Sequence, residues 1–180
     1  MEISYGNLCY HFPKKDDIIL RLHQNLLDEL DEYFEKLERQ IFQFDLMLTS
    51  IKRLMGLAWK YRFLFLSSYE LTLRYPVIKE KSIDRAVAYK KLLLRLSEFL
   101  MENEYMRKDP DEKQLEKFSH GLLIVFYSWV LDASVYHGES FKTEKIDYYF
   151  QLLFSLIRPS LTKKGREAFS AVYRKMTAEH

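Results

Sequence analysis

The sequence predicts an all-α protein. Only five glycines and four prolines interrupt its 180 residues, and no segment alternates apolar and polar residues as a half-buried strand would. Apolar residues instead recur every three or four positions through most of the chain, which is the spacing of amphipathic helices. With 48% hydrophobic and 30% charged residues, the composition is that of a globular protein and not of a disordered one.

Two helices are expected at the N-terminal end. Ser4 can cap a short helix that ends before Pro13, because a proline pushes the preceding residue out of helical geometry. Asp16 and Asp17 then place negative charge where the dipole of a second helix favours it. This second helix should be long and amphipathic, and it is predicted over residues 16–39.

Three helices are predicted in the middle of the chain, over residues 44–61, 63–74 and 77–103. The first carries a wide apolar stripe and should be buried. The second must end at Tyr75, because Pro76 follows it. The third carries apolar residues at helical spacing from Ile83 to Leu100.

The last three predicted helices span residues 110–134, 144–157 and 162–176. Asp109 would cap the first of them, with Pro110 at its first position, while Thr143 and Thr162 would cap the other two. The first of them is apolar nearly all round after His120, so it must be covered on more than one side.

The N-terminal segment carries the most specific motif. Ile3-Ser-Tyr-Gly-Asn-Leu-Cys-Tyr-His-Phe12, followed by Lys15, closely resembles the recognition helix and following turn of TetR family bacterial transcriptional regulators, over Ile3 to about Leu22. Two later segments are similar to the C-terminal domain of one branch of that family. They are Trp59-Lys-Tyr-Arg-Phe-Leu-Phe65 and Leu156-Ile-Arg-Pro-Ser-Leu-Thr162.

The resemblance implies a two-part organisation. Residues 1–40 would hold a recognition-helix remnant of a helix-turn-helix and a connecting helix, and residues 41–180 a TetR-like ligand-binding and dimerisation domain. In that family two helices precede the recognition helix, so roughly forty further residues are expected upstream of Met1.

The function that the resemblance implies is that of a repressor. It would sense a small apolar or aromatic effector and bind operator DNA as a homodimer when full-length. The alternative is a stand-alone dimeric module that binds a small molecule or a partner and has no DNA role.

The DNA-binding residues implied position by position are Ser4, Tyr5, Asn7, Tyr10, His11 and Lys15. The first three would face base edges or the groove wall, the next two would bind phosphate, and the lysine would contact the DNA backbone from the next helix. Cys9 stands where the family commonly has an aromatic residue.

Aromatic residues make up 16% of the chain, with thirteen tyrosines and thirteen phenylalanines. Such a content suits either an aromatic core or an apolar ligand pocket. Core packing remains the alternative for each candidate pocket residue. These candidates are Trp59, Phe63, Tyr69, Tyr89, His120 and Tyr127.

The helices over 110–134 and 144–157 form the pair that the family uses for a two-fold dimer, so the resemblance implies an isologous four-helix interface. Burial of the same side chains inside one protomer is the alternative. The interface candidates are Phe126, Tyr149, Phe150, Leu153 and Phe154.

Several functions lack a supporting motif. The single cysteine, Cys9, excludes an internal disulfide, and no two of the five histidines are three or four residues apart, as a helical zinc site needs. No nucleophile elbow, P-loop or dinucleotide motif is present, so no enzyme, metal or cofactor is expected. No apolar run reaches roughly 18 residues and no signal peptide starts the chain, so a cytoplasmic protein without a membrane partner is expected.

Overall fold

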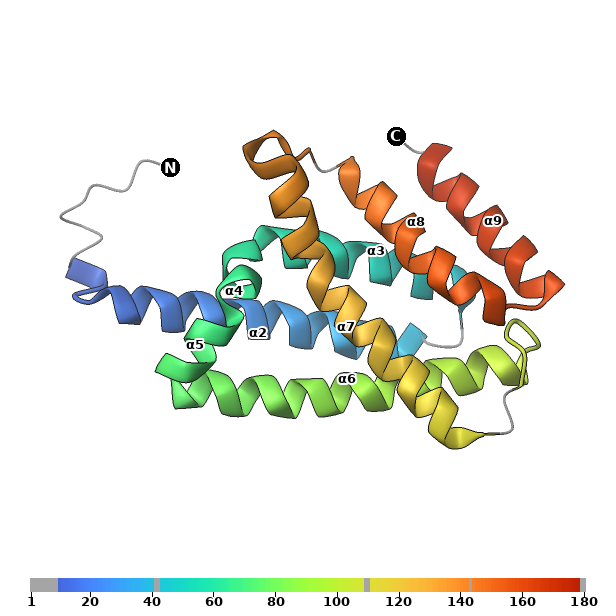
Figure 1. Ribbon diagram of the computed structural model, residues 1–180, viewed down its shortest axis with the longest axis horizontal. Coiled ribbons are helices and arrows are strands. Elements are labelled where there is room, and N and C mark those ends of the chain that lie inside the picture. The colour runs from blue at the N-terminus through green and yellow to red at the C-terminus, as the bar shows by residue number, and fades with distance from the viewer. Residues whose placement is uncertain (1–9, 41–42, 109–110, 143, 179–180) are drawn as a thin grey trace.

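The computed structural model describes residues 10–40, 43–108, 111–142 and 144–178. Within these ranges the prediction of an all-α fold is confirmed, since the chain there forms helices and a single isolated bridge between Met106 and Leu161. The helices, shown in Figure 1, are α2 (Lys15–Gln40), α3 (Phe44–Lys60), α4 (Arg62–Leu66), α5 (Ser68–Arg74), α6 (Pro76–Glu102), α7 (Glu112–His137), α8 (Lys145–Ile157) and α9 (Lys163–Ala178). Short 3-10 turns, η1 (Gly138–Ser140) and η2 (Arg158–Ser160), precede and follow α8.

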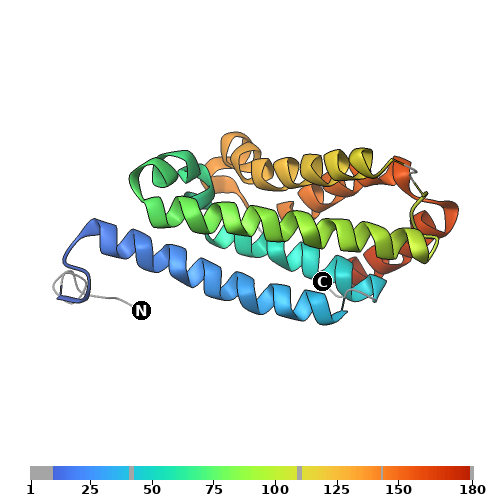
Figure 2. The ribbon, with the colours of Figure 1, turned by 90° about the horizontal axis from the view of Figure 1, so that it is seen from below.

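Helix α3 is central to the packing. It contacts α2 on one side and α8 and α9 on the other, while α7 crosses α6 and packs against α4 and α8. The long helices α2 and α6 run alongside each other, as seen from below in Figure 2. Because α2 packs on both α3 and α6, it is part of the helical body as well as its connection to the N-terminal segment.

Of the three apolar clusters among the described residues, two hold the long helices together. The larger one joins α3, α6, α7, α8 and α9 around Met55, Val130 and Tyr149. The smaller one joins α2 to α4, α5 and the start of α6 around Leu26 and Leu71. The helices therefore bury their apolar stripes against one another, as the spacing predicts.

The observed helix boundaries correct the predictions at three places. The segment 63–74 is not one helix, because the backbone leaves helical geometry at Ser67 and the two pieces pack on different partners, α4 on α7 and α5 on α6. The cap of α7 is Asp111 and not Asp109, since its side chain accepts a hydrogen bond from the Lys113 N–H at 2.9 Å. Helix α7 also extends to His137, beyond the expected end.

Of the three other predicted helix caps, the structure describes one. Thr162 is confirmed as a cap of α9, because the Gly165 N–H donates to its Oγ1 at 3.1 Å. The proposed caps Ser4 and Thr143 lie outside the described residues.

The start of α9 is docked on the turn that follows α6. The Thr162 N–H donates to the Tyr105 carbonyl at 3.0 Å, and the Thr162 hydroxyl donates to the Glu104 carbonyl at 2.6 Å. Gly165 faces the same turn so closely that a Cβ on it would lie 2.0 Å from the Tyr105 oxygen. A glycine is therefore required at this position for α9 to pack as it does.

Candidate functional site

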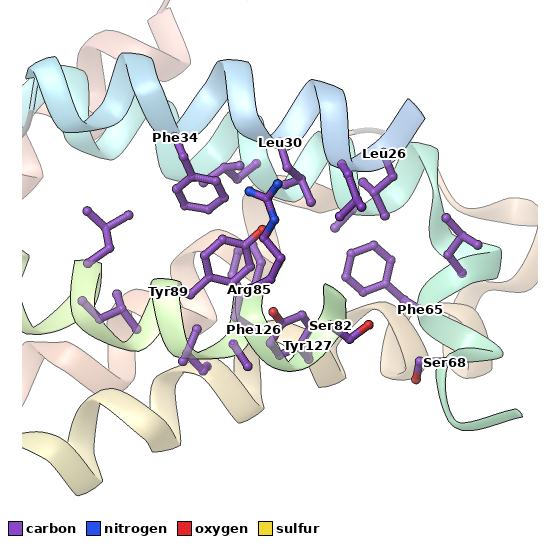
Figure 3. A pocket seen from close by; sticks show the side chains of 18 of the residues that line it. Leu26, Leu30, Phe34, Phe65, Ser68, Ser82, Arg85, Tyr89, Phe126 and Tyr127 are labelled. Carbon is purple, nitrogen blue, oxygen red and sulfur yellow. The ribbon is translucent and has the colours of Figure 1, made fainter. Parts of the chain in front are cut away.

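A pocket of about 580 Å³ lies between α2, α6 and α7, with α4 and α5 at one end. Its walls are mostly leucine, isoleucine and phenylalanine side chains, and few polar groups reach it, as Figure 3 shows. This volume and lining are typical of sites for small apolar ligands.

Arg85 of α6 forms the main electrostatic feature of the pocket. Its guanidinium makes a two-pronged ion pair with the carboxylate of Asp31 on α2, including an Nη2 to Oδ2 distance of 2.5 Å. The hydrogen bonds that the guanidinium donates to Asp31 raise the pKa of Arg85 above its ordinary value, so Arg85 is positively charged at neutral pH. This ion pair joins the two long helices that border the pocket.

Tyr89 lies one helical turn after Arg85 on the same face of α6. Its ring stacks on Phe34 of α2 with centroids 4.3 Å apart, and its hydroxyl lies beside the Arg85 guanidinium, as Figure 3 shows. The hydroxyl makes no hydrogen bond of good geometry with any described residue. Burial raises the pKa of the Tyr89 hydroxyl. It also raises the pKa of Tyr127, on the opposite wall, to about 12. Both hydroxyls therefore stay protonated at neutral pH.

His23 of α2 is the histidine of the lining. Burial, and secondly the positive charge of Lys81, lower the pKa of this imidazole below its ordinary value. His23 is therefore neutral at pH 7. The Lys81 ammonium donates to Gln24 of α2 at 2.7 Å, which adds another polar link between α2 and α6.

The N-terminal end of α2 is also fastened to the body. Asp16 accepts hydrogen bonds from the Tyr75 hydroxyl at 2.7 Å and from Arg74 at 2.8 Å. The tyrosine hydrogen bond, and secondly the charge of Arg74, lower the pKa of Asp16 below its ordinary value. Further along α2, Glu29 binds Lys60 at 2.6 Å.

The lowered pKa of Asp16 predicts a pH-dependent contribution to stability. Asp16 is ionised in the folded protein at lower pH than in the unfolded chain, so its stabilisation is present above the ordinary pKa and is lost as pH falls through the lowered value. Asp16→Asn should therefore lower Tm modestly at pH 7, and the difference from the parent should disappear in acid. Thermal unfolding at several pH values measures this.

Asp28→Asn is the matched control, because the Asp28 carboxylate accepts a hydrogen bond from Gln24 of its own helix. A Tm difference between parent and Asp16→Asn that stays constant with pH would contradict the assignment.

The structure brings together three of the predicted pocket residues. Tyr69, Tyr89 and Tyr127 line the cavity. Three others are placed elsewhere, and the prediction is wrong for them: Trp59, Phe63 and His120 are absent from the lining.

The reason differs for each misplaced residue. Trp59 stacks on Phe141 with centroids 3.6 Å apart, on the side of α3 away from the pocket. Phe63 is partly exposed at the surface, and His120 is exposed on α7. Helical spacing places these residues on a face but does not say which neighbour covers that face.

The sequence analysis did not predict several lining residues, above all Arg85 and Phe34, the ring that stacks on Tyr89. The four-residue spacing of Arg85 and Tyr89 places them on one helix face and was an available signal. Phe126 and Leu153, expected at a dimer interface, line the pocket instead.

The predicted dimer-interface side chains belong to the interior of the protomer. Tyr149, Phe150 and Leu153 are buried in the larger apolar cluster, and Tyr149 is only 2% exposed. Phe154 stacks on Phe169 of α9, and Phe126 is partly buried against the same cluster. The prediction is therefore wrong for Tyr149, Phe150 and Leu153, because other helices of the same chain cover these side chains.

The opposite face of the same two helices is exposed and apolar. We call it the α7/α8 face. It comprises Ile124, Leu131, Val135, Tyr136, Tyr148, Leu152 and Leu156, all exposed. Exposed apolar side chains gathered on neighbouring helices are typical of a protein interface.

One described helix, Lys113–His137, is long and apolar enough to cross a membrane by length and hydropathy alone. In the structure it packs against α4, α6 and α8, and its remaining apolar side chains contribute to the α7/α8 face. We therefore interpret it as a core helix with one apolar outer face.

Of the residues implied to bind DNA, Ser4, Tyr5 and Asn7 lie outside the described residues. Tyr10 and His11 are exposed just before α2, where Tyr10 is 81% exposed. Lys15 is the exposed first residue of α2. Among the described residues, no group of three or more His, Cys, Asp or Glu side chains is placed to hold a metal ion.

Comparison with known proteins shows what this fold resembles. A family profile described as "TetR: Bacterial transcriptional repressor" matches residues 26–169. A crystal structure of a TetR-family transcriptional regulator from Marinobacter aquaeolei VT8 superposes with a TM-score of 0.74 and 24% sequence identity, covering 96% of this chain and 82% of that chain. That identity supports likeness of fold alone. A search of curated proteins found no match.

Proposed function

Because the chain belongs to the TetR family of bacterial transcriptional regulators, we propose that it is a cytoplasmic repressor whose activity is controlled by a small apolar or aromatic effector. The observation that carries this proposal is the apolar pocket of about 580 Å³ between α2 and α6. Helix α2 is both a wall of this pocket and the segment that leads to Tyr10 and His11, the exposed residues proposed to bind phosphate.

A ligand in the pocket can act on DNA binding through α2. The helix has 26 residues and is therefore about 39 Å long, so a small tilt at its middle moves its N-terminal end by a larger distance. The side chains that fasten α2 to α6, Asp31 to Arg85 and Phe34 against Tyr89, lie at the pocket itself. A ligand bound beside these contacts would change how α2 packs on α6, and with it the spacing of two DNA-reading segments in a dimer and their fit to half-sites about one helical turn apart.

We place the dimer interface on the α7/α8 face. A two-fold contact pairs the same patch on both copies, and two helices from each would form a four-helix bundle. The exposed leucines and tyrosines of this face supply the apolar surface that such an interface needs.

A polypeptide of these 180 residues should dimerise but should not bind operator DNA specifically. Short helices are marginal in water without packing partners, so a recognition helix needs the two helices that precede it in the family to stay oriented. A mobility-shift titration at physiological salt, with DNA from the region upstream of the gene, measures this. Operator-specific binding by this polypeptide would contradict the prediction.

The proposed function is tested with a protein extended by the reading frame upstream of Met1. This protein should shift the same DNA fragment at low concentration, and compounds that release it should act through the pocket. Ala86→Trp places an indole at a lining position, so it should keep DNA binding and lose release. An upstream frame without two further helices, or an extended protein that binds no DNA, would contradict the repressor role.

A further inference from the structure

The pocket contains a buried hydroxyl, that of Tyr89, which makes no hydrogen bond of good geometry. Tyr89 is held by its stacking on Phe34, and its Oη is buried beside the Arg85 guanidinium, a contact that leaves the hydroxyl hydrogen without an acceptor of good geometry among the described residues. Buried polar groups in native proteins are nearly always hydrogen-bonded, so an unpaired one in a ligand cavity marks the place for a polar group of the ligand.

The charges of the pocket are already balanced. Among the described residues that line the pocket, Arg85 is the one Lys, Arg, Asp or Glu side chain. Both terminal nitrogens of its guanidinium donate hydrogen bonds to Asp31. A carboxylate ligand would have to compete with Asp31 for Arg85 and would be repelled by it. His23 is neutral at pH 7, so it offers no second positive charge.

The polarity of the site favours an acceptor on the ligand. The Tyr89 hydroxyl stays protonated and can donate, while the neighbouring Arg85 guanidinium makes the potential around it positive. A ligand oxygen with a partial negative charge is therefore favoured beside the Tyr89 hydroxyl, whereas a ligand group that donates a hydrogen bond is not.

We propose that the pocket binds an uncharged, largely apolar molecule with one hydrogen-bond acceptor, such as a ketone or ester carbonyl, to which the Tyr89 hydroxyl donates. The inference rests on the proposed function, since it names the class of effector that the same pocket takes. The apolar part of the molecule would lie against Leu30, Phe65 and Phe126.

Two fluorescent naphthalenes test the ligand class on the 180-residue chain. One is 6-propionyl-2-(dimethylamino)naphthalene, which is neutral and carries a ketone, and the other is 6-(dimethylamino)-2-naphthoate, its anionic counterpart. Fluorescence titration at pH 7 should show the ketone binding about tenfold more tightly or better than the carboxylate.

Three single-residue variants test which side chains determine the binding of the ketone. Tyr89→Phe should weaken binding of the ketone about two- to tenfold, the range for loss of one neutral hydrogen bond. Tyr173→Phe, a hydroxyl lost from α9 outside the pocket, should leave binding unchanged. Asp31→Asn should reverse the preference toward the carboxylate, because it leaves Arg85 unpaired beside the cavity. Thermal unfolding of each variant checks that it is folded.

The outcomes separate the two proposals. If the carboxylate binds the parent protein as tightly as the ketone, or if Tyr89→Phe behaves like Tyr173→Phe, the ligand class is wrong while an effector pocket stands. If neither naphthalene binds up to its solubility limit, effector sensing by this pocket is contradicted and the ligand class with it.

Discussion

Replacing Leu152 with aspartate should convert the proposed dimer into a folded monomer. Leu152 is 42% exposed on the α7/α8 face and contributes to no core cluster among the described residues. In a two-fold interface the substitution occurs twice, and each copy buries an unpaired carboxylate. We expect the dimer dissociation constant to rise roughly 100-fold or more. Analytical ultracentrifugation or light scattering at micromolar concentration measures the mass.

Phe150→Asp is the matched comparison, two residues earlier on α8. Phe150 is 3% exposed and packs against Phe169 and Tyr173 of α9. A carboxylate there is buried inside the protomer, so this variant should unfold, as lost helical circular dichroism would show. A parent protein that is monomeric at micromolar concentration, or a Leu152→Asp variant that remains dimeric, would reject the α7/α8 face as the interface.

Replacing Gly165 with alanine should destabilise the protein strongly although the change adds a single methyl group. The new Cβ would lie 2.0 Å from the Tyr105 oxygen and 2.9 Å from its carbonyl carbon, which are backbone atoms that cannot rotate away. The start of α9 would have to separate from the turn after α6, where Thr162 makes its hydrogen bonds. We expect a loss of about 2 kcal/mol or more and a fall in Tm of roughly 5 °C.

Gly56→Ala is the control, since Gly56 lies inside α3 and a Cβ there would meet no atom within 4 Å. Alanine in a helix interior is favoured over glycine by roughly 0.5–1 kcal/mol, so this variant should be slightly more stable than the parent. Equal Tm values for the two alanine variants would mean that the close approach of Gly165 to Tyr105 does not determine how α9 docks.

Local signals in the sequence predicted most helix ends. Pro76 marked the end of α5, and Thr162 marked the cap of α9, because proline geometry and side-chain capping act within one helical turn. The break at Ser67 has no such local signal. It arises because α4 packs on α7 and α5 on α6, which depends on residues far away in the chain.

The candidate site was predicted only in part for the same reason. Tyr89 and Tyr127 were expected in a pocket and line it, whereas Trp59 fills a space next to Phe141. Aromatic residues suit a core and a pocket equally well, so their identity does not distinguish the two. The ion pair of Asp31 with Arg85 joins residues 54 positions apart, a distance at which residue spacing carries no information.

The sequence by itself therefore determined the all-α class, the approximate extent of the helices and the resemblance to TetR regulators, since each depends on periodicity or on a short motif. The tertiary structure decided which side of each helix is covered. It buried Phe150 and exposed Leu152 on α8, and it placed Arg85 and Tyr89 against α2 as polar groups in the wall of the pocket. Apolar periodicity shows that a helix has a face to bury, but the neighbour that covers it is selected by packing among all the helices at once.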